Sequence, residues 1–227
     1  MIMIDRIFIR NWIPDDKDNP DEVEYKAILK KIQEQDLCID KNTFVRLYDW
    51  KARRSKNYLD LDNFKLYESG FKKIPDLRDE EKIKFYLKTK ERKKLPGILE
   101  PVASTILHFM YPDKFPIIDV RTVETLRDKG ILGEKVSYKE YRTEIFKIYD
   151  NCKREFSLRQ IDRALFTYNE EKGLLLSVIE EKKAITDVAR HLNNPQERII
   201  ELIMDLENDF KKKLLKLNKL KIEFDNI

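Results

Sequence analysis

The sequence predicts an all-α fold. Of its 227 residues, 39% are charged and only five are glycine, a composition that favours helices over turn-rich β-structure. Apolar residues recur at helical spacing through much of the chain, and capping motifs separate successive helices. Hydrophobic residues make up 41% of the chain and supply a sizeable core. We expect a helical domain over residues 1–173 and a C-terminal helical extension over residues 174–227.

The N-terminal third is predicted to hold one extended segment and three helices. Residues 6–12 alternate in part between apolar and polar side chains, which favours a strand or an extended arm. From residue 22 the apolar spacing follows the 3.6-residue period of a helix. Helices are therefore predicted from residue 22, over residues 43–55 with Tyr48 on the buried side, and over residues 61–68 with Gly70 as a left-handed C-terminal cap.

The middle of the chain is predicted to form two helices joined by a tight hairpin, over about residues 80–111. Residues 79–94 carry acids in the first turn and cations in the last, as the helix dipole favours. A Pro-Gly pair at Pro96 and Gly97 breaks this helix. The next helix begins at Pro101, where a missing N–H costs no intrahelical hydrogen bond.

An apolar connector over residues 115–119 leads from the hairpin to a helix over residues 120–129 that stops at Gly130. Ser137 and Ser157 each begin a capping box, with Glu140 and Gln160 three positions later. The boxes predict a helix to about residue 156 and a further helix that closes at Gly173.

The last fifty residues leave three interpretations open. Residues 186–203 have the outline of a helix-turn-helix, and a near-heptad apolar stripe continues from Ile199 to Phe224. The extension either packs on the core, pairs two subunits as a homodimer, or reads DNA.

Composition excludes several classes of protein. The two cysteines, Cys38 and Cys152, are too few for an iron–sulfur cluster or an all-cysteine zinc site, and we expect no metal site. No stretch is long and apolar enough for a membrane span, and the N-terminus does not resemble a signal peptide, so we expect a cytoplasmic protein. Net charge is only +4, but cations concentrate in residues 41–56 and 82–94, where they suit phosphate binding.

The Pro-Gly hairpin suggests contact with a nucleic-acid backbone. The first N–H groups of a helix have no intrahelical partner and, with the helix dipole, bind phosphate without reading a base. The predicted contacts at the hairpin are Pro96, Gly97, Leu99 and Pro101.

Hairpin and connector together resemble the helix-hairpin-helix DNA glycosylase superfamily, the endonuclease III type (HhH-GPD). Its Leu-Pro-Gly-aliphatic hairpin precedes an aspartate by 22 positions, the separation of Gly97 from Asp119 here. Residues 50–54, 115–121 and 157–165 are similar to uncharacterised bacterial relatives without an iron–sulfur cluster. The resemblance implies two helical subdomains with a cleft between them and Asp119 at its mouth.

In that family the aspartate works on an extruded nucleotide. Cleavage of the N-glycosidic bond builds positive charge on the sugar, which a carboxylate stabilises while it orients or deprotonates water. The resemblance therefore implies a base-excision DNA glycosylase that binds double-stranded DNA, with Asp119 catalytic. Asp is also a preferred helix N-cap, so Asp119 has a structural interpretation as well, and both hold together.

Two departures from the family narrow the expected chemistry. Leu99 replaces the hairpin's second glycine, so the turn that would bind a phosphate or a monovalent cation must differ from the family's turn or tolerate strain. Apart from such a cation, no cofactor is expected. Pro101 replaces the Schiff-base lysine of bifunctional members and cannot act as a nucleophile, which implies a monofunctional enzyme. Lys51, beside Trp50 on another helix, is a candidate to reach the cleft, where we expect a DNA contact rather than a Schiff base.

The remaining candidates are DNA and base contacts. Lys51, Arg53, Arg54 and Arg121 are predicted to contact phosphates. Trp50 and Tyr48 are candidates for the base pocket, although aromatic residues more often fill a core. Two other functions stay open: a non-catalytic DNA-binding protein that keeps the hairpin, and a DNA-associated regulator or assembly factor that depends on residues 174–227.

Overall fold

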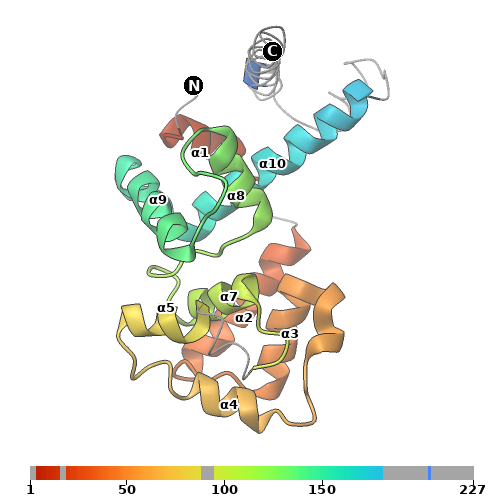
Figure 1. Ribbon diagram of the computed structural model, residues 1–227, viewed down its shortest axis with the longest axis vertical. Coiled ribbons are helices and arrows are strands. Elements are labelled where there is room, and N and C mark those ends of the chain that lie inside the picture. The colour runs from red at the N-terminus through yellow and green to blue at the C-terminus, as the bar shows by residue number, and fades with distance from the viewer. Residues whose placement is uncertain (1–3, 16–18, 88–94, 181–203, 206–227) are drawn as a thin grey trace, which may run out of the picture.

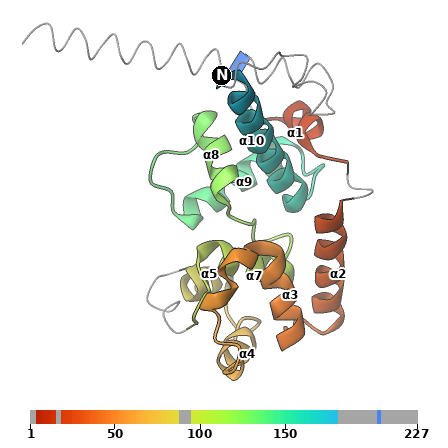
Figure 2. The same cartoon turned by 90° about the vertical axis from the view of Figure 1, so that its right-hand side faces the viewer.

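The computed structural model describes residues 4–15, 19–87, 95–180 and 204–205. Within these residues every regular element is a helix and no strand occurs, which confirms the all-α prediction. The helices pack in two groups, one above the other in Figures 1 and 2. The α10 group holds α1 (Arg6–Trp12), α8 (Val120–Asp128), α9 (Tyr138–Asn151) and α10 (Leu158–Glu180). The α7 group holds α2 (Pro20–Glu34), α3 (Lys41–Ala52), the 3-10 helix η1 (Arg53–Tyr58), α4 (Lys65–Phe71), α5 (Asp79–Leu87) and α7 (Glu100–Met110).

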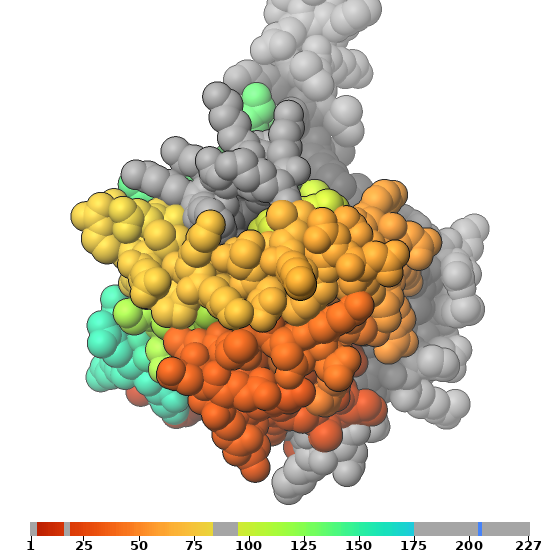
Figure 3. Space-filling model, turned by 90° about the horizontal axis from the view of Figure 1, so that it is seen from below, coloured from red at the N-terminus to blue at the C-terminus, as the bar shows by residue number. Residues whose placement is uncertain are grey.

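The core of the α7 group is built around α7 itself. Every residue from Val102 to Met110 is buried, because α2, α3 and α5 all pack on this short helix. Phe44 on α3 contacts the rings of Tyr67 and Phe71 on α4, with ring centres 5.1 and 5.2 Å away. Figure 3 views this group from below, where α2 to α4 supply most of the coloured surface.

The chain crosses between the two groups twice, and the second crossing positions Asp119. Residues 115–118 are buried, and their polar backbone atoms are tied to both groups. The hydroxyls of Tyr138 and Tyr141 on α9 donate to the carbonyls of Pro116 and Ile117, at 2.9 and 2.7 Å. The N–H of Ile118 donates to Ser104 Oγ on α7 at 3.1 Å. This anchored connector ends at Asp119, so the position of that residue is fixed from both sides.

The prediction of a strand or arm over residues 6–12 is wrong. These residues form α1, whose N-cap Asp5 accepts hydrogen bonds from the N–H groups of Ile7 and Phe8. Phe8, Ile9 and Trp12 are the buried residues, a spacing that follows a helix and not a strand. Phe8 and Trp12 pack on Tyr168 of α10, with ring centres 5.3 and 5.0 Å from it.

Three predicted helix ends are also wrong. Gly70 lies inside α4, α9 ends at Asn151, and α10 continues through Gly173 to Glu180. Both capping boxes are present, because Ser137 and Ser157 exchange hydrogen bonds with Glu140 and Gln160. Gly130 has the left-handed φ of +72° expected after α8.

The turn over residues 95–99 depends on Gly97. Its φ is +76°, and an added Cβ would lie 2.8 Å from the Leu59 side chain and 3.2 Å from the Tyr58 backbone. Leu99 has an extended conformation with φ −85°, so the missing second glycine causes no backbone strain there.

We expect Gly97→Ala to destabilise the protein by about 1–3 kcal/mol, because a left-handed alanine is strained and its methyl group meets backbone. Urea unfolding measures this loss. Gly133→Ala, at a position where nothing lies within 4 Å of the added Cβ, is the matched control and should change stability by less than about 1 kcal/mol. Equal effects of the two changes would contradict this account of the turn.

Several predictions fall on residues outside the described ranges. These are the cationic end of the helix over residues 88–94, the helix-turn-helix over residues 186–203 and most of the stripe that follows it. Of the described tail residues, Asp205 contacts Lys129, the C-cap of α8, and Tyr168 on α10. None of the described helices has the length and apolar character needed to cross a membrane.

Candidate functional site

A cavity of about 530 Å³ opens between the two groups of helices, within the size range of ligand pockets. Its lining is mostly charged and comes from α2, α3, α8 and α10, with two aromatic rings, Trp50 and Phe166. The ionisable residues of the lining are Asp21, Glu22, Lys51, Asp119, Arg121, Arg159, Asp162, Arg163 and Glu170. Segments from both halves of the chain therefore meet at one polar site.

Asp119 is the N-cap of α8 and also lines the cavity. Its carboxylate accepts the N–H of Arg121 at 3.0 Å, and its backbone N–H donates to Thr122 Oγ1, which completes a capping box. Its side chain is 21% exposed. The N-cap interpretation is confirmed, and the second carboxylate oxygen points away from the cap toward Lys51.

Lys51 on α3 forms an ion pair with Asp119 across the cavity. Its Nζ lies 2.7 Å from Asp119 Oδ2, and its side chain is only 11% exposed. Burial by itself raises the pKa of Asp119, but the charge and hydrogen bond of Lys51 and the Arg121 N–H outweigh burial, so the pKa lies below its usual value. Asp119 is therefore a carboxylate at neutral pH, suited to stabilise a cation or accept a proton.

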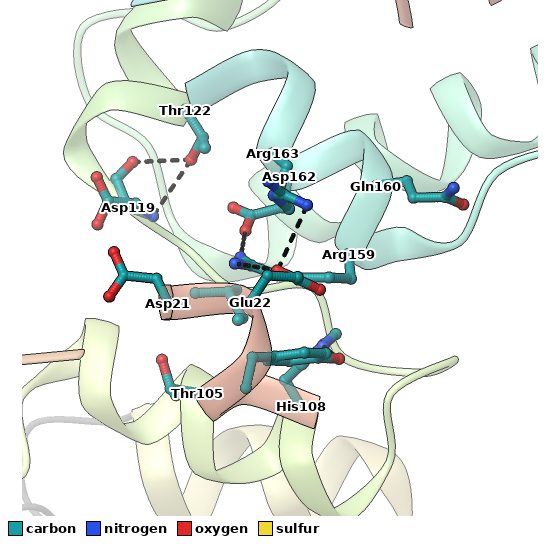
Figure 4. A network of polar contacts seen from close by, with 12 residues as sticks. Asp21, Glu22, Thr105, His108, Asp119, Thr122, Arg159, Gln160, Asp162 and Arg163 are labelled. Atoms are coloured by element: carbon teal, nitrogen blue, oxygen red, sulfur yellow. Dashed lines mark hydrogen bonds and ion pairs between the residues drawn. The ribbon is translucent and has the colours of Figure 1, made fainter. Parts of the chain in front are cut away.

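A second group of charges joins α2 to α10 beside Asp119 (Figure 4). Arg159 donates to Asp162 Oδ2 at 2.6 Å and to Glu22 Oε2 at 3.2 Å, and Arg163 Nη1 lies 3.5 Å from the same Glu22 oxygen. Glu22, Asp162 and Arg163 are buried. Burial raises the pKa of Asp162 even though Arg159 and Lys51 oppose the shift. These four residues, the Glu22–Arg159–Asp162–Arg163 cluster, form one wall of the cavity.

Arg159 is held by aromatic rings as well as by carboxylates. Its guanidinium carbon lies 4.9 Å from the ring centre of Tyr25 and 5.1 Å from that of Trp50. Trp50 packs edge-on against Phe109 and donates its indole N–H to the Asp21 carbonyl at 2.9 Å. The wall that contains Arg159 is consequently rigid.

Beneath this wall, His108 is buried and neutral. Its Nδ1 donates to the Phe115 carbonyl at 2.8 Å, so the unprotonated Nε2 accepts the Tyr25 hydroxyl at 2.8 Å. Burial lowers the pKa of His108 to about 4. The imidazole thus supports the connector and the aromatic floor under Arg159 and Trp50.

His108 makes folding stability depend on pH. The unfolded chain binds a proton on this residue below about pH 6.5, and the folded chain does so only near pH 4. The contribution of neutral His108 to the free energy of unfolding is fully present above about pH 6.5. It falls as the pH drops toward 4, by an amount on the order of 3 kcal/mol. Denaturant unfolding at several pH values should show that this component disappears in His108→Gln. A variant that keeps the same slope would contradict the assignment.

The structure brings some of the predicted site residues together and separates others. Asp119, Lys51, Trp50 and Arg121 all line the cavity. Lys51 is paired with Asp119, and its contact with a DNA phosphate stays a prediction. Tyr48 is 1% exposed and bonds through its hydroxyl to the Ser55 and Gly97 carbonyls, so it packs beneath the turn and does not line the cavity.

The predicted hairpin contacts and two of the predicted arginines lie outside the cavity. Arg53 and Arg54 are exposed on η1, which packs against the 95–99 turn at Gly97. On that turn and at the start of α7, Pro96, Leu99 and Pro101 are exposed, and no side chain caps the first N–H groups of α7. These residues form one exposed surface, separate from the cavity lining.

Glu22, Arg159, Asp162 and Phe166 are cavity residues that sequence reasoning missed. A signal for part of the set was present, because Arg159, Asp162 and Arg163 recur at helical spacing between the apolar residues of α10. A charged stripe on a helix that is otherwise buried indicates charges with partners elsewhere.

No group of His, Cys, Asp and Glu side chains suited to hold a metal ion occurs among the described residues. Comparison of the chain with protein-family models, curated proteins and solved structures found no match.

Proposed function

We propose that this protein is a monofunctional base-excision DNA glycosylase, which hydrolyses the N-glycosidic bond of a damaged or modified base. One observation carries the proposal: Asp119 is an ionised, partly buried carboxylate, fixed at a helix N-cap over a cavity of about 530 Å³. The 22-residue separation from Gly97 supports the proposal, because it equals the separation in the glycosylase family.

The chemistry follows from the charge on Asp119. As the bond from sugar to base breaks, positive charge grows on the sugar, and a carboxylate beside it lowers the barrier. A carboxylate oxygen of Asp119 also accepts a proton from the attacking water. Lys51 keeps the carboxylate ionised and oriented, and in its ion-paired form it has no lone pair for attack on the sugar.

DNA would lie over the surface formed by η1 and the 95–99 turn. Arg53 and Arg54 are exposed there, and the uncapped N–H groups at the start of α7 suit a phosphate oxygen. Arg121, at the rim of the cavity, would contact the phosphate nearest the extruded nucleotide. A monovalent cation at the turn stays a prediction; the Pro96 and Gly97 carbonyls there accept hydrogen bonds from the Tyr67 and Tyr48 hydroxyls.

The test is a set of duplexes that each carry one uracil, hypoxanthine, 8-oxoguanine or alkylated base, incubated with the full-length protein. We expect abasic product from at least one duplex and salt-sensitive binding to all of them. Binding without product from any duplex would favour the alternative, a non-catalytic DNA-binding protein that uses the same exposed surface. Absence of duplex binding would contradict both.

Reduction with borohydride distinguishes the monofunctional mechanism from a lysine-dependent one. We expect no covalent protein–DNA adduct during base release, because Asp119 holds the Lys51 side chain in an ion pair. An adduct that forms in the wild type and in Lys56→Met but not in Lys51→Met would show that Lys51 is a nucleophile. Lys56, with its Nζ 2.7 Å from Asp49, is the matched control because it has the same kind of partner outside the cavity.

A further inference from the structure

We propose that Phe166 is the ring on which the extruded base stacks, and that Arg121 covers this ring until a DNA phosphate draws the arginine away. The proposal deepens the function proposed above and rests on it. It assigns roles in base recognition to two neighbours of Asp119, one of which the sequence did not single out.

Two aromatic side chains line the cavity, and each carries a guanidinium group on its ring. Arg121 Cζ lies 4.6 Å from the ring centre of Phe166, and Arg159 Cζ lies 5.1 Å from that of Trp50. A planar cation and a planar base use the same face of a ring. A base can therefore stack where an arginine now lies only if that arginine can leave.

The two arginines differ in how firmly they are held. Arg159 is 15% exposed and is bonded to two buried carboxylates, Glu22 and Asp162. Arg121 is 41% exposed, and Glu170, which forms an ion pair with it at 2.8 Å, is itself 49% exposed. Exposed ion pairs contribute little to stability, whereas breaking a buried one is costly. Phe166 is thus the ring whose covering arginine is more easily displaced.

A DNA phosphate can replace Glu170 as the partner of the Arg121 side chain. Arg121 is the second residue of α8, and its backbone N–H stays bonded to the Asp119 carboxylate while the long side chain changes partner. An Arg–phosphate contact is charge-assisted and bidentate, and it replaces a solvent-exposed carboxylate. Binding of the DNA backbone would therefore uncover the Phe166 ring at the moment when the nucleotide enters next to Asp119.

The experiment compares binding of two duplexes that differ only at one position. One carries a mismatched 2-aminopurine, which is easily extruded, and the other carries tetrahydrofuran, an abasic analogue with no base to stack. The measured quantity is the ratio of the two dissociation constants, taken for the full-length protein at one salt concentration. Thermal unfolding of each variant establishes that it is folded.

We expect the wild type to prefer the duplex that carries the base. Phe166→Leu, which keeps an apolar side chain but removes the ring, should reduce this preference about 5- to 100-fold. Phe166→Trp should retain it, because it keeps an aromatic face. Phe146→Leu is the matched control: Phe146 on α9 is also half-buried under an arginine, with Arg142 Cζ 4.9 Å from its ring centre, but it does not line the cavity.

A second variant tests the role of the cover. Glu170→Gln removes the negative charge that holds Arg121 and should tighten binding of both duplexes by up to about fivefold. Equal ratios for Phe166→Leu and Phe146→Leu, or a wild type that binds both duplexes equally, would overturn the stacking role alone. A wild type that binds neither duplex would overturn the proposed function together with it.

Discussion

Glu22→Gln should destabilise the protein by about 3–5 kcal/mol, the loss typical of a buried ion pair that has one partner removed. Glu22 is 4% exposed, and its Oε2 faces Arg159 at 3.2 Å and Arg163 at 3.5 Å. The variant leaves the charges of both arginines without this compensation, at side chains that are at most 15% exposed. Urea unfolding at neutral pH measures the difference.

Glu24→Gln provides the control on the same helix. Glu24 holds Arg46 through two hydrogen bonds of 2.8 Å, a better geometry than that of Glu22, but both side chains are substantially exposed. Solvent screens this pair, so we expect a loss below about 1 kcal/mol. A Glu22 variant no less stable than the Glu24 variant would show that the charged wall does not hold the two groups of helices together.

Asp119→Asn should slow base release by about 10²–10⁴-fold, the contribution typical of a positioned acid–base group. The asparagine side chain still accepts the Arg121 N–H, so the cap of α8 is kept while the negative charge is lost. In the wild type the lowered pKa of Asp119 keeps the carboxylate ionised in mild acid. The rate should therefore begin to fall only below the pH at which an ordinary aspartate protonates.

Asp40→Asn separates catalysis from capping. Asp40 is the N-cap of α3, accepts the Thr43 N–H at 2.7 Å and lies 3.2 Å from Lys31, so it combines the same cap and ion pair outside the cavity. The Asp40→Asn variant should release the base at the rate of the wild type. Similar losses of rate in both variants would mean that Asp119 only supports the fold.

Local signals in the sequence were sufficient for most of the helices. Ser137 and Ser157 indicate helix starts because each hydroxyl accepts the backbone N–H of the residue three positions later, and Gly130 ends α8 by its own conformation. The N-terminal segment was misread because a seven-residue helix offers too few positions to separate a period of 2 from one of 3.6.

The sequence indicated single residues of the site, Lys51 and Trp50 among them, but not the contacts between them. Asp119 follows from its capping position and its separation from Gly97. Its partner Lys51 lies 68 positions away, and Glu22 lies 137 positions from Arg159, so neither pairing leaves a pattern in a window of neighbouring residues. Such contacts arise from the packing of α2 and α3 against α8 and α10.

The central claim is that the Asp119 carboxylate releases a base from DNA, and single-turnover measurement of abasic product tests it most directly. The wild type and Asp119→Asn are compared on the duplex that the wild type processes best, at protein concentrations that saturate binding. We expect product from the wild type, a rate at least about 100-fold lower for the variant, and unchanged duplex affinity. Equal rates for the two proteins, or no product from any duplex, would contradict it.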